Sequence, residues 1–435
     1  MDLALRSQFP DLPEIILWKA ELMFGGLRFT DALARAVDDG AAPNFYPYRR
    51  KGASGLAETI AVPYLFDLGG KAVARIRVDD RAGMEVQRDE RGRYSLWRVA
   101  QGSEPARPLC DVSFVRKHGW QTFRTEDGLD AFSAGAEQLG DMIVVNVAPG
   151  CEYFTARETS GPLAGQSLKC SFCAYGRFDR RSITLGQEQG RLALDELTPR
   201  RIEAVLRAAA ADGSAGHVYI TGGSVLDPEL EVERFLPVVE AVRRGVGDRL
   251  RVTVGSGAVD PAGSQRYRDA GADSACYNLE TWDAATFEAC CPGKSKHVGR
   301  QRWIDGLLGA VEVFGRGNVG SAFVAGLELV PPGPCLSHEA FLASVLEGAA
   351  FLLDHGVVPL YSPLWPIDGT AYGIQHGIPP ALYVTLEQRL HALRAERGVR
   401  VPGWLICPHC SFMLLEVDFD RALGVEETCE PLAAS

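Results

Sequence analysis

The chain has 435 residues, of which 46% are hydrophobic and 23% are charged, as in ordinary globular proteins. Its net charge of -11, with no basic block, argues against general nucleic-acid binding, because few cations are available to neutralise phosphates. The first residues lack the pattern of a secretory signal and no apolar run reaches about 18 residues, so we expect a cytoplasmic chain without a membrane span.

The amino-terminal part, residues 1–140, has a mixed pattern. A helical stretch at residues 16–37 precedes alternating segments at 71–80 and 92–101 that are typical of strands. We therefore expect an accessory α+β region, whose chemistry the sequence does not indicate.

Residues 141–375 change rhythm, because short β-branched runs now alternate with longer helical patterns. Six strands are predicted, at residues 142–148, 217–221, 250–254, 275–280, 319–328 and 357–361. Helices are predicted between them at 198–211, 230–244, 261–270, 299–314 and 338–355; Thr198 and Pro199 form a helix start signal. This alternation predicts a parallel α/β sheet that either stays open or curls into a full or partial barrel. In each case function gathers at the carboxyl ends of the strands.

The unusual motifs all fall at that end of the predicted sheet. Cys151 follows the first strand, "TGGS" ends the second, "NLET" the fourth and "GLE" the fifth, and "SPLWPIDGT" follows the sixth. Such a shared position is not expected of accidental motifs.

Eleven cysteines, an odd and clustered set, favour metal binding or chemistry over a disulfide framework. Cys170 and Cys173 form a Cys-x-x-Cys pair, and Cys151 lies upstream of it. The pair alone fits a redox dithiol or half of a zinc site, whereas three thiolates on one loop suit an iron–sulfur cluster. The isolated cysteines are expected to be small buried hydrophobes; they are Cys110, Cys276, Cys290, Cys291, Cys335 and Cys429.

The segment "KCSFCAYG" resembles the second half of the Cys-x3-Cys-x2-Cys motif of the radical S-adenosylmethionine (radical SAM) superfamily. Phe172 stands where that family has an aromatic residue near the adenine of SAM. Eighteen residues replace three in the first half, and we interpret residues 152–169 as an insertion that loops out without moving the thiolates. The resemblance implies a partial (β/α)6 barrel with a [4Fe–4S] cluster on Cys151, Cys170 and Cys173, whose fourth iron binds SAM.

The same resemblance assigns further SAM-binding residues. Gly222 and Gly223 would receive the SAM amino group, with Ser224 in place of the usual acid. "YNLET" is similar to the ribose-binding stretch of the biotin synthase and lipoyl synthase branch, which gives that role to Asn278 and Glu280. Gly326 and Glu328 would end the adenine-binding strand. The nearby cations include Lys294, Lys296, Arg300 and Arg302, of which we favour Arg300 as partner of the SAM carboxylate.

Residues 376–435 form a short carboxyl-terminal extension that contains "CPHC". Cys407 and Cys410, with His409 or Cys429, could hold a second metal; alternatively, one of the two thiols acts catalytically on a substrate radical, or both lie unligated in a buried turn.

These features favour a radical SAM enzyme that cleaves SAM reductively and uses the 5′-deoxyadenosyl radical to abstract hydrogen from a small molecule, in cofactor or natural-product biosynthesis. An electron donor such as flavodoxin or ferredoxin is implied, and no nucleic-acid or membrane partner is expected. The alternatives are a non-catalytic iron–sulfur or zinc redox protein and a Cys-x-x-Cys dithiol oxidoreductase.

Overall fold

The computed structural model describes residues 2–51, 57–147, 151–160, 164–174, 196–367, 369–373, 377–407 and 409–423. The chain divides into two compact units. Unit 1 comprises Met1–Lys117, Pro380–Glu387 and Pro408–Glu427, and unit 2 comprises His118–Pro379, Gln388–Cys407 and Thr428–Ser435.

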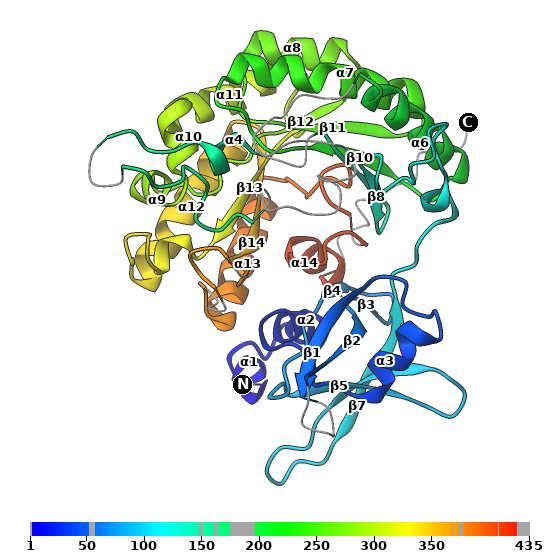
Figure 1. Cartoon of the computed structure of the whole chain (residues 1–435). Helices are drawn as coiled ribbons and strands as arrows, with labels where there is room; N and C mark the ends of the chain where they lie inside the picture. Colours follow the sequence, from blue (N-terminus) through cyan, green and yellow to red (C-terminus); the bar gives the residue numbers. More distant parts are fainter. Residues whose placement is uncertain are drawn as a thin grey trace. The chain divides into compact units, whose positions relative to one another are not determined.

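Unit 1 contains a five-stranded antiparallel sheet and a two-stranded hairpin, coloured blue to cyan in Figure 1. The sheet has the order β4-β3-β7-β6-β5, and its strands are β3 (Leu65–Leu68), β4 (Val73–Arg75), β5 (Met84–Arg88), β6 (Tyr94–Arg98) and β7 (Arg107–Phe114). The hairpin pairs β1 (Phe45–Lys51) with β2 (Ala57–Pro63). Alternating burial in β5 and β6 places one face of the sheet on a hydrophobic core, as the alternating sequence predicts.

The helical stretch predicted at residues 16–37 is two helices, α2 (Glu14–Gly25) and α3 (Asp31–Asp38), which follow α1 (Asp2–Gln8). Gly26 ends α2 with a φ of 75°, and a Cβ atom there would lie 2.6 Å from the carbonyl oxygen of Arg77. The chain needs glycine at this turn because other residues rarely adopt that φ and would meet the backbone.

Two further helices belong to the carboxyl-terminal region: α13 (Pro380–Glu396) and α14 (Glu416–Ala422). Within unit 1, Lys19 of α2 and Asp418 of α14 form a fully buried ion pair with an Nζ to Oδ2 distance of 2.5 Å.

Unit 2 is built on a seven-stranded sheet of the order β14-β13-β12-β11-β10-β9-β8. Its strands are β8 (Ala136–Leu139), β9 (Met142–Asn146), β10 (His217–Thr221), β11 (Arg251–Gly255), β12 (Ser274–Cys276), β13 (Val319–Ala325) and β14 (Val357–Pro363). The six strands β9 to β14 are mutually parallel, and only β8 is antiparallel to its neighbour β9. The prediction of an α/β core with six parallel strands, a partial barrel, is confirmed; residue 148 of the first predicted strand lies outside the described residues.

Helices connect the parallel strands, as predicted from the alternating pattern. They are α6 (Thr198–Asp212), α7 (Pro228–Val246), α8 (Pro261–Asp269), α9 (Ala284–Cys290), α10 (Pro292–His297), α11 (Arg300–Phe314) and α12 (His338–Asp354). Asp227, Asp260, Asp283 and Ser337 cap four of them through side-chain oxygens that accept backbone N–H groups, which is why these helices begin where they do. Figure 1 shows α7, α8 and α11 together on one side of the sheet, and α7 packs on β11 while α11 packs on β12 and β13.

The fourth and fifth predicted strands end well before the predicted residue. The fifth, β13, ends at Ala325 because Gly326 adopts a φ of 107°, and a short 3-10 helix, Leu327–Leu329, follows. The fourth, β12, ends at Cys276 rather than at Glu280, because side chains interrupt the backbone pairing with β13 at Asn278 and Leu279. The Leu279 N–H bonds the Ser321 hydroxyl (3.0 Å), and the Ala322 N–H bonds the Asn278 amide oxygen (3.1 Å).

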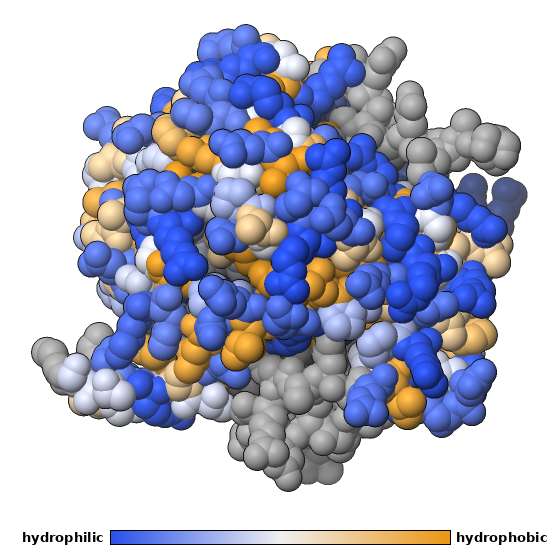
Figure 2. Space-filling view, turned by 90° about the horizontal axis from the view of Figure 1, so that it is seen from above, coloured by the Kyte–Doolittle hydropathy of each residue, from blue (hydrophilic) through white to orange (hydrophobic). Residues whose placement is uncertain are grey.

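On the face seen in Figure 2, hydrophilic residues predominate and hydrophobic residues are interspersed among them. Within the part of the chain that the structure describes, no helix combines the length and apolarity needed to cross a lipid bilayer.

Candidate active site

The segment between Cys151 and Cys170 folds back on itself. After the short helix α4 (Glu152–Thr155), the backbone of Ala156 and Glu158 pairs with that of Gln166 and Leu168 through bonds of 2.9 and 3.1 Å. Gly165 N–H also donates to the Glu158 carbonyl at 2.8 Å. We call residues 151–173 the cysteine loop and this antiparallel pairing its neck. It returns the chain to the neighbourhood of Cys151 just before Cys170, which accounts for the wide spacing of the cysteines.

The start of the cysteine loop is attached to the turn after β10. Glu152 N–H donates to the Ser224 carbonyl, and Leu226 N–H donates to the Glu152 carboxylate, both at 2.8 Å. Cys151 is the residue before Glu152 and therefore lies beside the predicted "TGGS" turn.

The end of the cysteine loop is attached to helix α9 and to the segment that follows β14. Ser171 N–H donates to the Cys290 carbonyl at the end of α9, and Ala371 N–H, after β14, donates to the Ser171 carbonyl, both at 2.8 Å. The hydroxyl of Tyr372 lies 2.9 Å from that of Ser171 and 3.4 Å from the Cys290 thiol. Segments that follow β9, β10, β12 and β14 thus meet around one loop.

The thiols of this loop differ in their electrostatic surroundings. Burial and, after it, the neighbouring Cys170 raise the pKa of Cys151 to about 11. The Cys291 thiol hydrogen-bonds Cys170 and, against the effect of burial, lowers its pKa together with the nearby Lys294 ammonium. Cys173 closes the loop with an N–H bond of 3.1 Å to the Cys170 carbonyl.

Lys294 is the buried cation of this region. Its ammonium lies 2.6 Å from the Glu280 carboxylate and 2.7 Å from the Asn278 carbonyl, and it stands over the Trp303 ring at 4.4 Å. Burial disfavours the charge on Lys294, but Glu280, Cys170 and Cys291 outweigh this and raise the pKa of Lys294.

Arg300, favoured from the sequence as a ligand of the SAM carboxylate, is engaged elsewhere. Its guanidinium donates twice to the Trp282 carbonyl, at 2.9 and 2.5 Å, and stacks on the Trp282 ring. Lys294, four residues after Cys290, lies beside Cys170 and Cys291 together with its partner Glu280.

Asn278 and Glu280 have different surroundings. The Asn278 amide oxygen accepts from Ala322 N–H and from the Cys276 thiol, so it holds β13 beside the end of β12. Glu280 adopts a φ of 73°, uncommon for a residue with a side chain, and turns its carboxylate to Lys294.

The "TGGS" turn is supported by two residues that the sequence did not single out. Glu231 of α7 is buried and accepts N–H groups from Val225, at 3.1 Å, and from Gly257 after β11. Arg234 donates to the Gly223 carbonyl. Both lie one turn inside a helix, where charged residues are ordinarily exposed, so only their depth in the fold distinguishes them.

Gly326 and Glu328, predicted within the fifth strand, lie directly after β13, and Glu328 belongs to the short 3-10 helix. A Cβ on Gly326 would come within 2.9 Å of the Gly377 backbone. Glu328 is 2% exposed and accepts a 2.6 Å bond from the Thr281 hydroxyl; burial raises its pKa. Phe172, between Ser171 and Cys173, is half-buried.

The remaining cysteines fall into separate places. Cys276, Cys290 and Cys291 are buried as expected, whereas Cys335 is exposed and Cys110 only partly buried, so the expectation was wrong for these two. Cys429 lies outside the described residues. Cys407 and Cys410 lie near Asp141 and His217, which stand at the amino ends of β9 and β10, the opposite end from the cysteine loop.

Residues 166–321 match the family model of the radical SAM superfamily. The chain carries a radical SAM domain. The matched segment includes Cys170, Cys173 and every strand from β10 to the start of β13, and the predictions of this family and of an enzyme are thereby confirmed.

The chain is also similar to a curated protein. Bacteriochlorophyllide c C-7(1)-hydroxylase of Chlorobaculum limnaeum is 26% identical over 263 residues, which are 58% of this chain and 59% of the relative. The chain thus aligns with little more than half of that relative's length.

Solved structures with a similar arrangement have low sequence identity. A radical SAM methyltransferase from Sphaerobacter thermophilus is 13% identical, with a TM-score of 0.39 over 82% of this chain and 75% of its own. Methylornithine synthase is 16% identical, with a TM-score of 0.38 over 60% of this chain and 70% of its own.

Proposed function

We propose that this radical SAM enzyme holds a [4Fe–4S] cluster on Cys151, Cys170 and Cys173 and uses SAM to abstract hydrogen from a small-molecule substrate. The observation that carries the proposal is the neck of the cysteine loop, which brings Cys170 back beside Cys151 in spite of the eighteen intervening residues. Three thiols from one loop, with no disulfide among them, are the donor set that such a cluster requires. When bound, the cluster and SAM supply a 5′-deoxyadenosyl radical by reductive cleavage of the sulfonium.

The residues around the loop have distinct tasks in this proposal. The backbone of Gly222, Gly223 and Ser224 receives the polar end of SAM, since glycine permits close approach of a ligand. Lys294 and Glu280 form a charged pair that suits the carboxylate and amino or hydroxyl groups of the same molecule, and Lys294 takes the role first given to Arg300.

Aromatic and apolar groups would keep water from a reactive carbon radical. Phe172 is half-buried within the cysteine loop. Tyr372 packs against Ser171 and Cys290 from the segment after β14. Asn278 and Glu328 support this end of the sheet, the first by its bond to Ala322 and the second by its bond to Thr281.

The substrate is proposed by class. The name of the Chlorobaculum relative describes hydroxylation of a tetrapyrrole pigment, and we place this chain among enzymes that modify a small molecule in cofactor or natural-product biosynthesis. A reductant such as flavodoxin or ferredoxin would supply the electron. A second metal site near the carboxyl terminus is also proposed and is argued below.

The test is anaerobic reconstitution with iron and sulfide, followed by dithionite and SAM and measurement of 5′-deoxyadenosine. We expect product from the native chain and none from Cys151→Ala, Cys170→Ala or Cys173→Ala. Cys335→Ala is the matched control, because this exposed thiol lies outside the loop.

Three results would contradict the proposal. Iron binding without 5′-deoxyadenosine would indicate a non-catalytic iron–sulfur protein. Dithiol exchange that needs neither iron nor Cys151 would indicate an oxidoreductase. A Cys151→Ala chain that keeps its full iron content and activity would show that Cys151 is not the third cluster ligand.

A further inference from the structure

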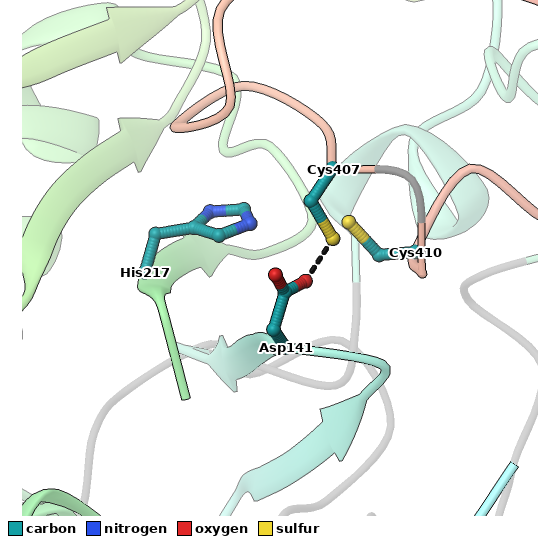
Figure 3. A group of neighbouring side chains, drawn as sticks. All are labelled: Asp141, His217, Cys407 and Cys410. Atoms are coloured by element: carbon teal, nitrogen blue, oxygen red, sulfur yellow. Dashed lines mark hydrogen bonds between the residues drawn. The ribbon is translucent and has the colours of Figure 1, made fainter. Parts of the chain in front are cut away.

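Four potential metal ligands converge at the amino end of the sheet, and the radical SAM domain gives them no role. Each of Asp141, His217, Cys407 and Cys410 offers one ligand atom, and these atoms all lie within 4.8 Å of one another. Figure 3 shows the four side chains directed toward a common point, with the Cys407 thiol donating to the Asp141 carboxylate.

The sheet itself positions the first two ligands. Asp141 immediately precedes β9, and His217 begins β10 and pairs with Met142. The Asp141 carbonyl also accepts the Gly216 N–H at 2.8 Å. The relative position of the carboxylate and the imidazole is therefore determined by the backbone.

The carboxyl-terminal segment brings Cys407 to the same place by packing. The Trp404 carbonyl accepts the Thr253 hydroxyl of β11 at 3.3 Å, and a Cβ on Gly320 of β13 would lie 2.7 Å from Leu405. The Leu405 side chain therefore packs on β13 at the position where the strand has Gly320. Cys407, two residues later, has no exposed surface. Cys410, 2% exposed, is the second thiol of the same short Cys-Pro-His-Cys motif.

The donor set indicates a particular metal. Two thiolates, one imidazole and one carboxylate are all ordinary zinc ligands, and four protein ligands are typical of a closed structural site. Zinc bonds of roughly 2.0–2.3 Å in a tetrahedron separate ligand atoms by about 3.3–3.8 Å. Small side-chain rotations are enough to bring ligand atoms that lie within 4.8 Å of one another to these distances. A [4Fe–4S] cluster fits poorly, because it is normally held by cysteines and only two are present here.

The surroundings also favour a cation. Two thiols and a carboxylate gathered with little exposure are costly to ionise unless a positive charge lies among them.

The position argues for a structural rather than a catalytic centre. The five residues of β10 separate His217 from the turn after Thr221 by roughly 13 Å, so the group is remote from the cysteine loop. Features at the amino end of parallel barrel strands generally serve stability.

We propose that Asp141, His217, Cys407 and Cys410 bind one Zn²⁺ in a closed site that fastens the carboxyl-terminal segment to the amino end of the sheet. The ligands differ from those considered from the sequence: His409 is exposed, whereas Asp141 and His217 belong to the sheet.

The test uses the full chain produced in zinc-supplemented medium, with zinc and iron per chain measured by elemental analysis. The Cys151→Ala/Cys170→Ala/Cys173→Ala chain removes the cluster ligands, and we expect it to keep about one zinc. The zinc content per chain should fall at least tenfold in Cys407→Ser and in His217→Asn. It should be unchanged in His409→Asn, because His409 is an exposed neighbour. The proposal fails if the triple variant holds no zinc, or if Cys407→Ser or His217→Asn keeps it.

A second measurement covers variants that do not fold. CoCl2 added to the metal-free triple variant should produce the visible bands of tetrahedral cobalt and a thiolate-to-metal charge-transfer band, and ZnCl2 should abolish both. Absence of the charge-transfer band would overturn the thiolate ligation. These readouts do not involve SAM, so they succeed or fail independently of the proposed radical chemistry.

Discussion

At the residue scale, Lys294 has an influence that its surface-like sequence context does not suggest. Its side chain is 8% exposed and pairs with a Glu280 side chain that is 14% exposed. The same ammonium lowers the pKa of Cys170. One cation therefore acts on both the Glu280 carboxylate and the Cys170 thiol, the groups that we propose to face SAM and the cluster.

Replacing Lys294 with methionine keeps the apolar stem and removes the charge. We expect Lys294→Met to lower cluster occupancy and weaken SAM binding by roughly 10–100-fold, the usual effect of losing a group that supports metal ligands. Iron analysis and equilibrium dialysis with SAM after anaerobic reconstitution measure both quantities.

Lys296→Met is the matched control for this change. Lys296 lies two residues later, is 39% exposed and pairs with Glu158 on the surface, so its loss should leave iron and SAM binding unchanged. Equal behaviour of the two variants would show that charge at position 294 has no special role.

At the scale of elements, the neck of the cysteine loop makes the positions of the cysteines in space independent of their spacing in the sequence. Backbone bonds join residues 156–158 to residues 165–168, and the Ser167 hydroxyl donates to the carbonyls of Tyr153 and Phe154 at 3.2 and 3.1 Å. The positions of the two ends therefore depend on the neck and not on the length of the chain beyond it.

Shortening the loop tests this interpretation. A chain in which residues 159–164 are replaced by Asn-Gly, a sequence suited to a tight hairpin turn, should bind iron and form 5′-deoxyadenosine as the native chain does. Leu168→Pro removes the N–H that bonds Ala156 and should lose most of the cluster.

Opposite behaviour would contradict the role of the neck. If the shortened loop loses iron while Leu168→Pro keeps it, the residues beyond the neck, rather than the neck itself, position Cys170.

At the scale of the whole molecule, segments that lie far apart in the sequence, Met1–Lys117 and Pro408–Glu427, belong to one unit. Lys19 donates to Asp418 and to the Ser411 carbonyl, both at 2.5 Å, with no exposed surface on the lysine. Burial lowers the pKa of Lys19 and raises that of Asp418 to about 6, although their mutual attraction opposes both changes. A buried pair of this kind is costly to break because one charge is then left without its partner.

Asp418→Ala should therefore destabilise unit 1 by about 3–5 kcal/mol, whereas Lys19→Met/Asp418→Leu, which removes both charges, should recover most of that loss. Hydrogen exchange of peptides from α2 reports the opening free energy locally. Arg93→Ala, which breaks an exposed surface pair with Asp89, is the control and should not change it. A double variant as unstable as Asp418→Ala would argue against the pair as the cause.

Much of this architecture could be predicted because local patterns specify it. The six parallel strands follow from short β-branched runs, and several helices begin at Asp or Ser caps or at a proline. The strand ends of β12 and β13 were misjudged because Asn278, Ser321 and Gly326 act through side-chain bonds and an unusual φ, which a hydrophobic pattern does not contain.

The site was less accessible from the sequence than the fold. The Cys170 and Cys173 pair could be found because its members lie close together in the sequence, whereas Cys291, Glu231 and Lys294 reach the site only through the packing of helices. Asp141 and His217 are single residues at strand starts, and only the strand register makes them neighbours. Contacts over such separations carry no local signal.

Because unit 1 includes Pro408–Glu427, it can be completed only near the end of translation. Its sheet and first helices emerge early, but Asp418 is translated 399 positions after Lys19, about 20–80 s later at ordinary ribosomal speeds. Throughout that interval the nascent lysine has no counter-ion and must stay hydrated. An isolated fragment of the first 117 residues would lack the counter-ion of Lys19 permanently. Such a fragment is therefore a candidate for chaperone binding rather than independent folding.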